Sequence, residues 1–147
     1  VVSFKAVLWH ELAILMVGAL IVYITWDAPN QVGTGTYLVL WVMRTSAKLN
    51  LFFGVRNLSE EFLPVHLSYL KSFFKRRAMN AFYPFALLGA SACLWWLIDY
   101  AHNPLAGPAQ VVGAVLVGTM LALAIVEHLM LVLPLDTTTL WRWATGW

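Results

Sequence analysis

Four long apolar stretches dominate the 147-residue sequence and limit what the chain can fold into. They cover residues 6–26, 34–55, 81–100 and 109–133. Each is about as long as the roughly 20 residues that a helix needs to cross a bilayer. None alternates between apolar and polar residues as the strands of a membrane β-barrel do. The sequence therefore predicts an all-α, polytopic membrane helix bundle with four transmembrane helices.

The composition excludes several other classes of protein. Hydrophobic residues make up 61% of the chain and charged residues 11%, whereas a soluble domain carries roughly 25% charged residues. A soluble enzyme domain, a nucleic-acid-binding module and a disordered tail are therefore poor interpretations. Cys93 is the single cysteine, so no intrachain disulfide can form. We find no nucleophile paired with a base and no phosphate-binding loop, and we expect no enzymatic activity.

The distribution of positive charge predicts the orientation. No Lys or Arg lies in loops 27–33 and 101–108, whereas five of the nine lie in segment 56–80. By the positive-inside rule, this segment and both termini are expected on the cytoplasmic side. Residues 1–147 then form a single transmembrane domain. It begins without methionine, so we expect either a processed chain or a fragment of a longer chain. Aromatic residues are expected to mark the two membrane interfaces: Trp26, Trp95, Trp96 and Tyr100 at one, and Trp9, Tyr83, Trp141 and Trp143 at the other.

Segment 56–80 is predicted to form an amphipathic helix on the cytoplasmic surface. Ser59 with two following glutamates is typical of a helix start, and Leu67, Leu70 and Phe74 then fall on one face. The segment can enforce topology, anchor the chain to anionic lipids or bind a partner, and the sequence leaves these roles open. Its candidate contact residues are Arg56, Glu60, Glu61, His66, Lys71, Lys75, Arg76 and Arg77.

Ionisable residues inside the apolar stretches are the main candidates for a site. Arg44 and Lys48 are four apart and share a helix face, where each needs an acidic partner. Glu11, Lys48 and Glu127 all lie roughly 10 Å from the cytoplasmic ends of their stretches, at 1.5 Å per residue. We therefore expect a buried charged layer of Glu11, Arg44, Lys48, Asn50 and Glu127, with Ser46 as a further partner. Ion pairing that fixes helix packing, contact with a ligand or pigment, and proton chemistry all remain open.

Two intramembrane histidines, His10 and His128, are candidate pigment ligands. A chlorophyll-type magnesium needs one axial imidazole and a small residue one turn away, where the flat macrocycle can lie. Ala6 precedes His10 by four residues, and Ala124 precedes His128 by four. The alternative is that each histidine is hydrogen-bonded to its surroundings. Because the four histidines form no paired metal-ligand spacing, we expect no dedicated metal site.

Several motifs spread over nearly the whole chain resemble one known family. They are residues 10–13 (HELA), 29–34 (PNQVGT), 39–64 with RTSAKLNLFFG and NLSEEFLP, 66–71 (HLSYLK), 76–80 (RRAMN), 127–128 (EH) with 131–134 (LVLP), and 141–143 (WRW). This set resembles the photosynthetic-complex assembly proteins of purple and related phototrophic bacteria, known as PuhE. Members of that family are longer at the N-terminus, so the resemblance implies that this chain is a C-terminal part.

The resemblance implies a function and a set of partners. It implies a non-enzymatic assembly factor or accessory subunit of the reaction centre–light-harvesting complex, located in the intracytoplasmic photosynthetic membrane. The expected partners are reaction-centre and light-harvesting subunits and membrane lipids, without nucleic acid. One alternative is a protein that binds or delivers bacteriochlorophyll, with bacteriochlorophyll or carotenoid at the helix surfaces. A second alternative is a small proton-coupled carrier.

Overall fold

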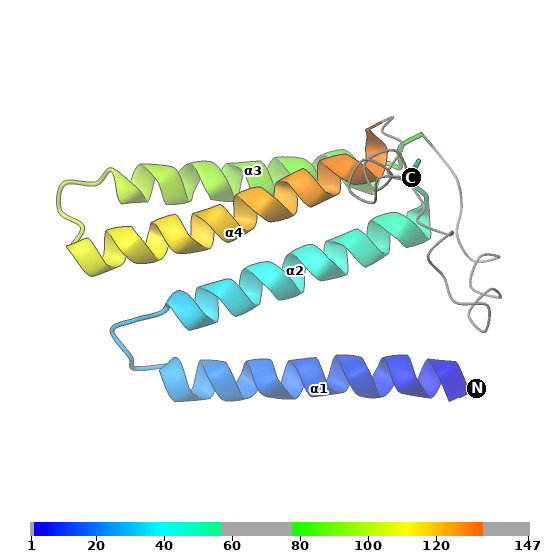
Figure 1. The fold of residues 1–147 in the computed structure, drawn as a ribbon, viewed down its shortest axis with the longest axis horizontal. Coiled ribbons are helices and arrows are strands. Elements are labelled where there is room, and N and C mark those ends of the chain that lie inside the picture. Colours follow the sequence, from blue (N-terminus) through cyan, green and yellow to red (C-terminus); the bar gives the residue numbers. More distant parts are fainter. Residues whose placement is uncertain (1, 57–77, 134–147) are drawn as a thin grey trace, which may run out of the picture. The chain divides into compact units, whose positions relative to one another are not determined.

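The computed structural model describes residues 2–56 and 78–133, and four α-helices account for most of them (Figure 1). Their bounds are α1 Val2–Thr25, α2 Val32–Phe53, α3 Phe82–Ala101 and α4 Pro108–Val132. The predicted all-helical architecture is confirmed for these residues, and the last three helices begin and end within two residues of the expected stretches. The amphipathic helix expected over 56–80 lies outside the described residues except for Arg56 and residues 78–80, which are not helical.

Three of the four helices are long and apolar enough to cross a membrane. The qualifying segments are Leu8–Thr25 in α1, Phe82–Ala101 in α3 and Pro108–Val132 in α4. The helix α2 is not in this set, although it has 22 residues. Polar and charged side chains in its second half lower its mean hydropathy, so length and composition alone support three spans.

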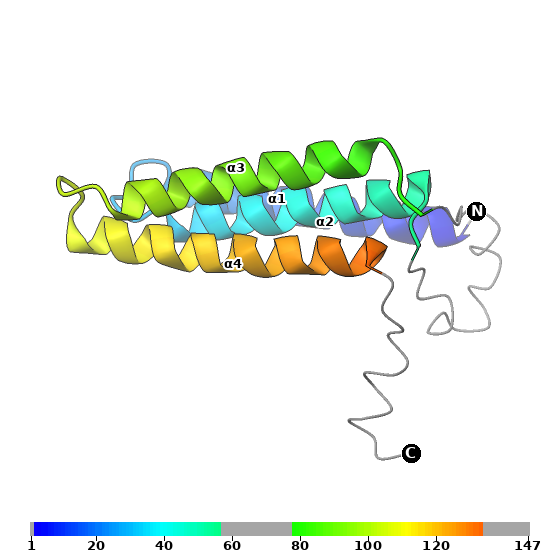
Figure 2. The same cartoon turned by 90° about the horizontal axis from the view of Figure 1, so that it is seen from above.

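Short hydrogen-bonded turns join the helices in two pairs (Figure 2). Between α1 and α2, Gln31 donates to the carbonyls of Thr25 and Ala28, which closes the end of α1. Between α3 and α4, the Gln110 side chain accepts from the Gly107 amide at 2.9 Å. This bond to the residue before Pro108 is half of a capping box. Local sequence therefore accounts for where α4 begins.

The chain divides into two compact units that share α2, α3 and α4. Unit 1 comprises Val1–Val42 and Cys93–Ala122, and unit 2 comprises Met43–Ala92 and Leu123–Trp147. The division falls within the helices, so each of these three helices contributes one part to each unit.

Glycines allow close helix contacts in unit 1. The Tyr37 ring of α2 lies against Gly18 of α1, where a methyl group would overlap it. The Tyr37 hydroxyl donates to the Ile14 carbonyl at 2.9 Å. A methyl group at Gly113 of α4 would lie 2.9 Å from Val32 Cγ2. Small residues in membrane helices let backbones approach in this way.

Unit 2 has a mixed core of apolar and polar side chains. Its buried apolar residues are Met43, Val55, Tyr83, Ala90 and Ala124, and its buried polar residues are Ser46, Asn50, Asn80 and His128. Tyr83 is only 5% exposed and packs into the core of unit 2 from the first turn of α3, so its side chain faces the protein interior. Its place at a membrane interface stays a prediction. Trp9, Trp26, Trp95 and Trp96 are exposed.

Candidate functional site

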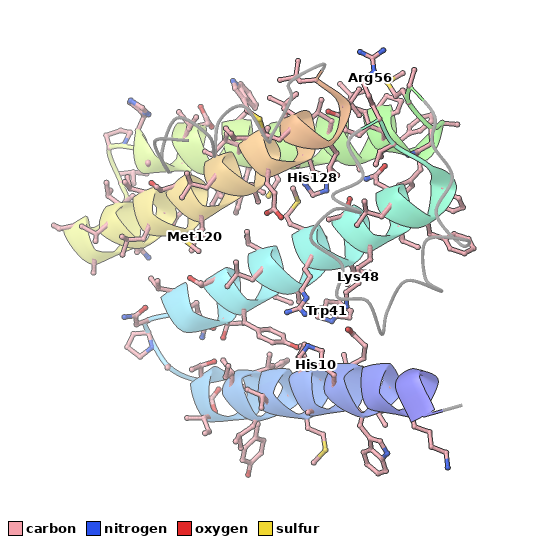
Figure 3. All side chains as sticks on the ribbon, turned by 45° about the vertical axis from the view of Figure 1, so that its right-hand side comes forward. His10, Trp41, Lys48, Arg56, Met120 and His128 are labelled. Carbon is pink, nitrogen blue, oxygen red and sulfur yellow. The ribbon has the colours of Figure 1, made fainter. Side chains whose placement is uncertain are left out.

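Four buried polar residues of unit 2 form one hydrogen-bonded group, which we call the polar cluster. Its members are Ser46 and Asn50 on α2, Asn80 just before α3, and His128 on α4 (His128 is labelled in Figure 3). Asn50 and His128 are almost completely buried, at 0% and 1% exposed. The hydrogen bonds of the cluster therefore connect α2 with α4 and with the start of α3.

His128 uses both ring nitrogens within the cluster. Nδ1 lies 2.9 Å from the Ala124 carbonyl oxygen, and Nε2 lies 3.0 Å from Ser46 Oγ. Because a carbonyl oxygen can only accept, Nδ1 must carry a proton. In a neutral imidazole, Nε2 then accepts from the Ser46 hydroxyl. A magnesium ion at Nε2 would have to displace Ser46, so this geometry favours the hydrogen-bonded alternative for His128.

Asn50 links the two ends of the cluster. Its amide donates to the Ser46 carbonyl at 3.0 Å, and its Oδ1 accepts from Asn80 Nδ2 at 3.1 Å. Residues 46 and 50 are one turn apart, so both project from the same face of α2. A polar side chain in the apolar interior is costly unless it is hydrogen-bonded. Among the described residues, no buried side-chain nitrogen or oxygen lacks a hydrogen-bond partner.

Asn80 closes the end of α2 and begins α3. Its amide donates to the Gly54 carbonyl at 3.0 Å, and its Oδ1 accepts from the Tyr83 amide at 2.9 Å. The second bond is typical of an N-cap, in which a side-chain oxygen satisfies an amide of the first turn. Gly54 ends α2 with a φ of 110°, a conformation that glycine adopts without strain. The residues on either side of segment 55–79 are thus bonded to each other.

The polar cluster can hold helices together, but its groups satisfy one another. No group of three or more His, Cys, Asp or Glu residues that could hold a metal ion occurs in the described ranges 2–56 and 78–133. The hydroxyl of Ser46 is hydrogen-bonded to the imidazole of His128, which also donates to the Ala124 carbonyl. The His128 side chain is almost inaccessible to solvent. We therefore interpret the cluster as a structural element that sets the packing of unit 2.

The structure places the predicted charged residues of α2 on a different face from the cluster. Residues two apart on a helix are separated by about 200°, so Arg44 and Lys48 point away from the side that Ser46 presents to His128. Both are exposed, whereas Ser46 and Asn50 are buried. Asn50 is therefore brought together with Ser46, Asn80 and His128 rather than with the charges. Arg44 and Lys48 each have at least one interaction partner.

The other members of the expected charged layer are less buried than we predicted. Glu11 is half-buried, and the neighbouring candidate pigment ligand His10 is exposed; each of the two has at least one interaction partner. Glu127 is exposed on α4. Ion pairing of Glu11 and Glu127 with the cations of α2 remains a prediction, as does a pigment at His10.

Of the candidate cytoplasmic contact residues, only Arg56 falls within the described part of the chain, and it is exposed. The other seven lie outside the described residues: Glu60, Glu61, His66, Lys71, Lys75, Arg76 and Arg77.

Sequence reasoning missed Asn80, although a signal for it exists. An asparagine immediately before a long apolar stretch is a common helix-start signal, and Asn80 precedes the stretch 81–100 directly. That signal would have identified the cap on α3. The bonds from Asn80 to Asn50 and Gly54 join residues 26 to 30 positions apart, and no local pattern encodes them.

Comparisons with known proteins place the chain in a family. A family model described as "Protein of unknown function (DUF3623)" matches residues 1–146. The chain is also 36% identical over 144 residues to a Rhodobacter capsulatus protein named "Uncharacterized 30.4 kDa protein in puhA 5'region". That match covers 96% of this chain and 51% of the relative, so the chain spans about half of the relative's length. No solved structure matches the chain significantly. Since the family model covers nearly every residue, the chain belongs to the family of proteins described as DUF3623.

Proposed function

We propose that the chain is a non-enzymatic assembly factor or accessory subunit of the bacterial reaction centre–light-harvesting complex. The observation that carries this proposal is the relative from Rhodobacter capsulatus, which its name locates in the 5′ region of puhA. This gene context supports a role connected with photosynthesis. It agrees with the resemblance of the sequence motifs to the PuhE assembly proteins. The partners we propose are membrane subunits of that complex, bound helix to helix.

The exposed surface of α1 supports binding of partner helices within the membrane. Only 6% of the residues of Leu8–Thr25 are buried, compared with 33% in α4. Trp9, Met16 and Tyr23 are 70%, 73% and 82% exposed and follow each other at seven-residue intervals, so they lie along one stripe. Large apolar side chains in such a stripe face either lipid or another transmembrane helix.

We propose that α2 is a fourth span and that both termini and segment 56–80 are cytoplasmic. At 1.5 Å per residue, its 22 residues extend about 33 Å, which is enough to cross the roughly 30 Å hydrocarbon core. Two of its polar side chains, Ser46 and Asn50, are satisfied within the polar cluster. The proposed function places the chain in the photosynthetic membrane. In the proposed orientation, segment 56–80 faces the cytoplasm and offers a surface for lipids or partners.

Purification from phototrophic membranes tests the proposed function. The tagged chain is extracted in mild detergent, and the near-infrared spectrum and the subunit stoichiometry of the eluate are measured. A second tagged polytopic protein from the same membranes serves as the control. We expect reaction-centre and light-harvesting proteins in fixed proportion to the chain. A colourless eluate without these proteins would contradict the proposal, and pigment without them would favour pigment delivery instead.

A further inference from the structure

An exposed carboxylate on α4 has no role in the packing described so far. Glu127 lies five residues before the end of α4 at Val132. Its side chain is exposed, and its carboxylate forms no hydrogen bond or ion pair within the part of the chain that the structure describes. The helix itself offers no cationic partner, because α4 contains no Lys or Arg. Apolar residues surround this position, since 120–126 and 129–135 contain no charged residue.

Glu127 belongs to the outward face of α4. Leu123 and Val126, which lie four and one residues before it, are 62% and 48% exposed. The adjoining face carries Ala124 and His128, about 60° and 100° around the helix from Glu127; they are 8% and 1% exposed and contribute to the core of unit 2. Glu127 therefore lies at the edge of the face that unit 2 leaves uncovered, beside the apolar side chains of Leu123 and Val126.

A carboxylate in this position is unfavourable in lipid. Ionisable residues of membrane helices almost always face a bundle interior or a water-filled cavity, and they pair with one another. The uncovered face of α4 offers neither within unit 2. A guanidinium group satisfies a carboxylate best, because it donates two parallel hydrogen bonds that match the two oxygens. Charge complementarity thus indicates a partner helix that carries a cation, and the geometry of the carboxylate favours a guanidinium group as that cation.

We propose that the face of α4 formed by Leu123, Val126 and Glu127 docks a transmembrane helix of a partner subunit, which places an arginine against Glu127. This inference rests on the proposed function as a binder of membrane helices and names the surface and the chemistry of the partner. The apolar side chains supply the contact area, and the charge pair sets the depth at which the partner helix docks. Polar contacts between membrane helices specify partners and register in the same way.

Lys48 is a poorer partner for Glu127 than an arginine from another subunit. On α2, Ser46 faces His128, and Lys48 projects about 200° away from Ser46 around the helix. Lys48 also has at least one interaction partner already. The pair of Glu127 with a partner arginine is therefore an alternative to the pair of Glu127 with Lys48, which the similar depth of these two residues in the membrane predicts. One experiment can distinguish the two pairs.

A model transmembrane peptide provides the test. The full chain is reconstituted in phosphatidylcholine vesicles, where the absence of anionic lipid prevents non-specific attraction of arginine. The chain carries a fluorescent donor at its N-terminus. The probe is a 22-residue Leu-Ala helix with an acceptor dye and one Arg placed five residues from one end. A matched peptide has Gln at that position, and a third has Glu. Energy transfer then reports the association of each peptide with the chain.

The variants isolate the carboxylate of Glu127. Glu127→Gln removes the charge and keeps the shape, and Glu127→Arg reverses the charge. Asp99→Asn is the matched control, because Asp99 is an exposed carboxylate on α3. We expect the Arg peptide to bind the unmodified chain about 5–30-fold more tightly than the Gln peptide. Glu127→Gln should remove this preference, Asp99→Asn should preserve it, and Glu127→Arg should prefer the Glu peptide. Circular dichroism confirms that each variant remains helical.

Several outcomes would overturn the inference. One is equal binding of the Arg and Gln peptides by the unmodified chain, which would mean that Glu127 is accommodated in lipid without a cation. Another is an Arg preference that survives Glu127→Gln or disappears in Asp99→Asn. A third is a Lys48→Met variant that binds the Arg peptide more tightly than the unmodified chain, because Lys48 would then occupy Glu127. Each of these failures leaves the co-purification result intact, so the proposed function and this surface can fail separately.

Discussion

The two units of this chain hold their helices together by different means. In unit 1, glycines bring α1, α2 and α4 close together, as at the contact of Gly18 with Tyr37. In unit 2, hydrogen bonds among Ser46, Asn50, Asn80 and His128 join the elements. Lipid tails are as apolar as the helix surfaces, so burial of apolar area alone drives helix association only weakly in a membrane. Close packing and polar contacts are the two remaining means. Unit 1 combines close glycine contacts with the bond from Tyr37 to the Ile14 carbonyl, whereas unit 2 buries a connected group of hydrogen bonds.

The largest effect is expected from Asn80→Ala, which removes the most connected member of the polar cluster. The substitution leaves Asn50 Oδ1 and the Tyr83 amide without their partner and removes the cap of α3. We expect a loss of roughly 2–4 kcal/mol in the free energy of unfolding, from one cap and one unsatisfied buried group. Denaturant titration in mixed micelles measures it. Asn103→Ala is the control, because Asn103 is exposed in a turn, and an equal loss there would refute a special role for the cluster.

The glycine contact of unit 1 is tested by Gly18→Leu. A side chain at this position must displace the Tyr37 ring and break the bond from Tyr37 to the Ile14 carbonyl. Overpacking of this kind costs about 1–3 kcal/mol. Gly89→Leu is the matched control, since nothing lies within 4 Å of a Cβ at Gly89. Thermal melts of both variants in the same detergent should separate them. Equal melting temperatures would show that unit 1 does not depend on this close contact.

Ser46→Ala tests the hydrogen bonds of unit 2 separately from its packing, because it removes a hydroxyl with little change in volume. His128 Nε2 would lose its donor while remaining buried. An unsatisfied buried acceptor costs about 1–2 kcal/mol, towards the lower end of the range for buried polar groups. The exposed Ser91 of α3 provides the control variant Ser91→Ala. Unfolding titrations that rank Ser91→Ala as the more damaging change would exclude a structural role for the contact between Ser46 and His128.

Tyr37→Phe is expected to have the smallest effect, because it keeps the ring against Gly18 and removes only the hydroxyl. Hydrogen bonds between membrane helices contribute about 0.6 kcal/mol on average and about 1.7 kcal/mol at most. The same titration compares this variant with Tyr23→Phe, whose tyrosine is 82% exposed. A loss for Tyr37→Phe as large as that for Gly18→Leu would mean that the hydrogen bond, rather than the close approach, stabilises unit 1.

The helices themselves could be predicted because the signals that define them are local. Apolar length located all four within a few residues, and residues such as Gly107, Pro108 and Gln110 explain where α4 begins. The candidate site could be predicted only in part. The sequence marks His128, Ser46 and Asn50 as polar residues in apolar stretches, but it predicts a charged layer for Ser46 and Asn50 and a pigment ligand or a hydrogen-bonded side chain for His128. Depth along a helix can be counted from sequence, whereas the face that meets a neighbouring helix cannot.

The sequence by itself determined the helix boundaries, the family and the set of polar residues that need partners inside apolar stretches. Only the tertiary structure decided which partners they have. In it, Ser46 and Asn50 of α2 contact His128 and Asn80. Arg44 and Lys48 lie on another face of α2 and are exposed. The physical reason is that helix formation depends on hydrogen bonds four residues apart, whereas partner choice depends on contacts between residues as far apart as Ser46 and His128.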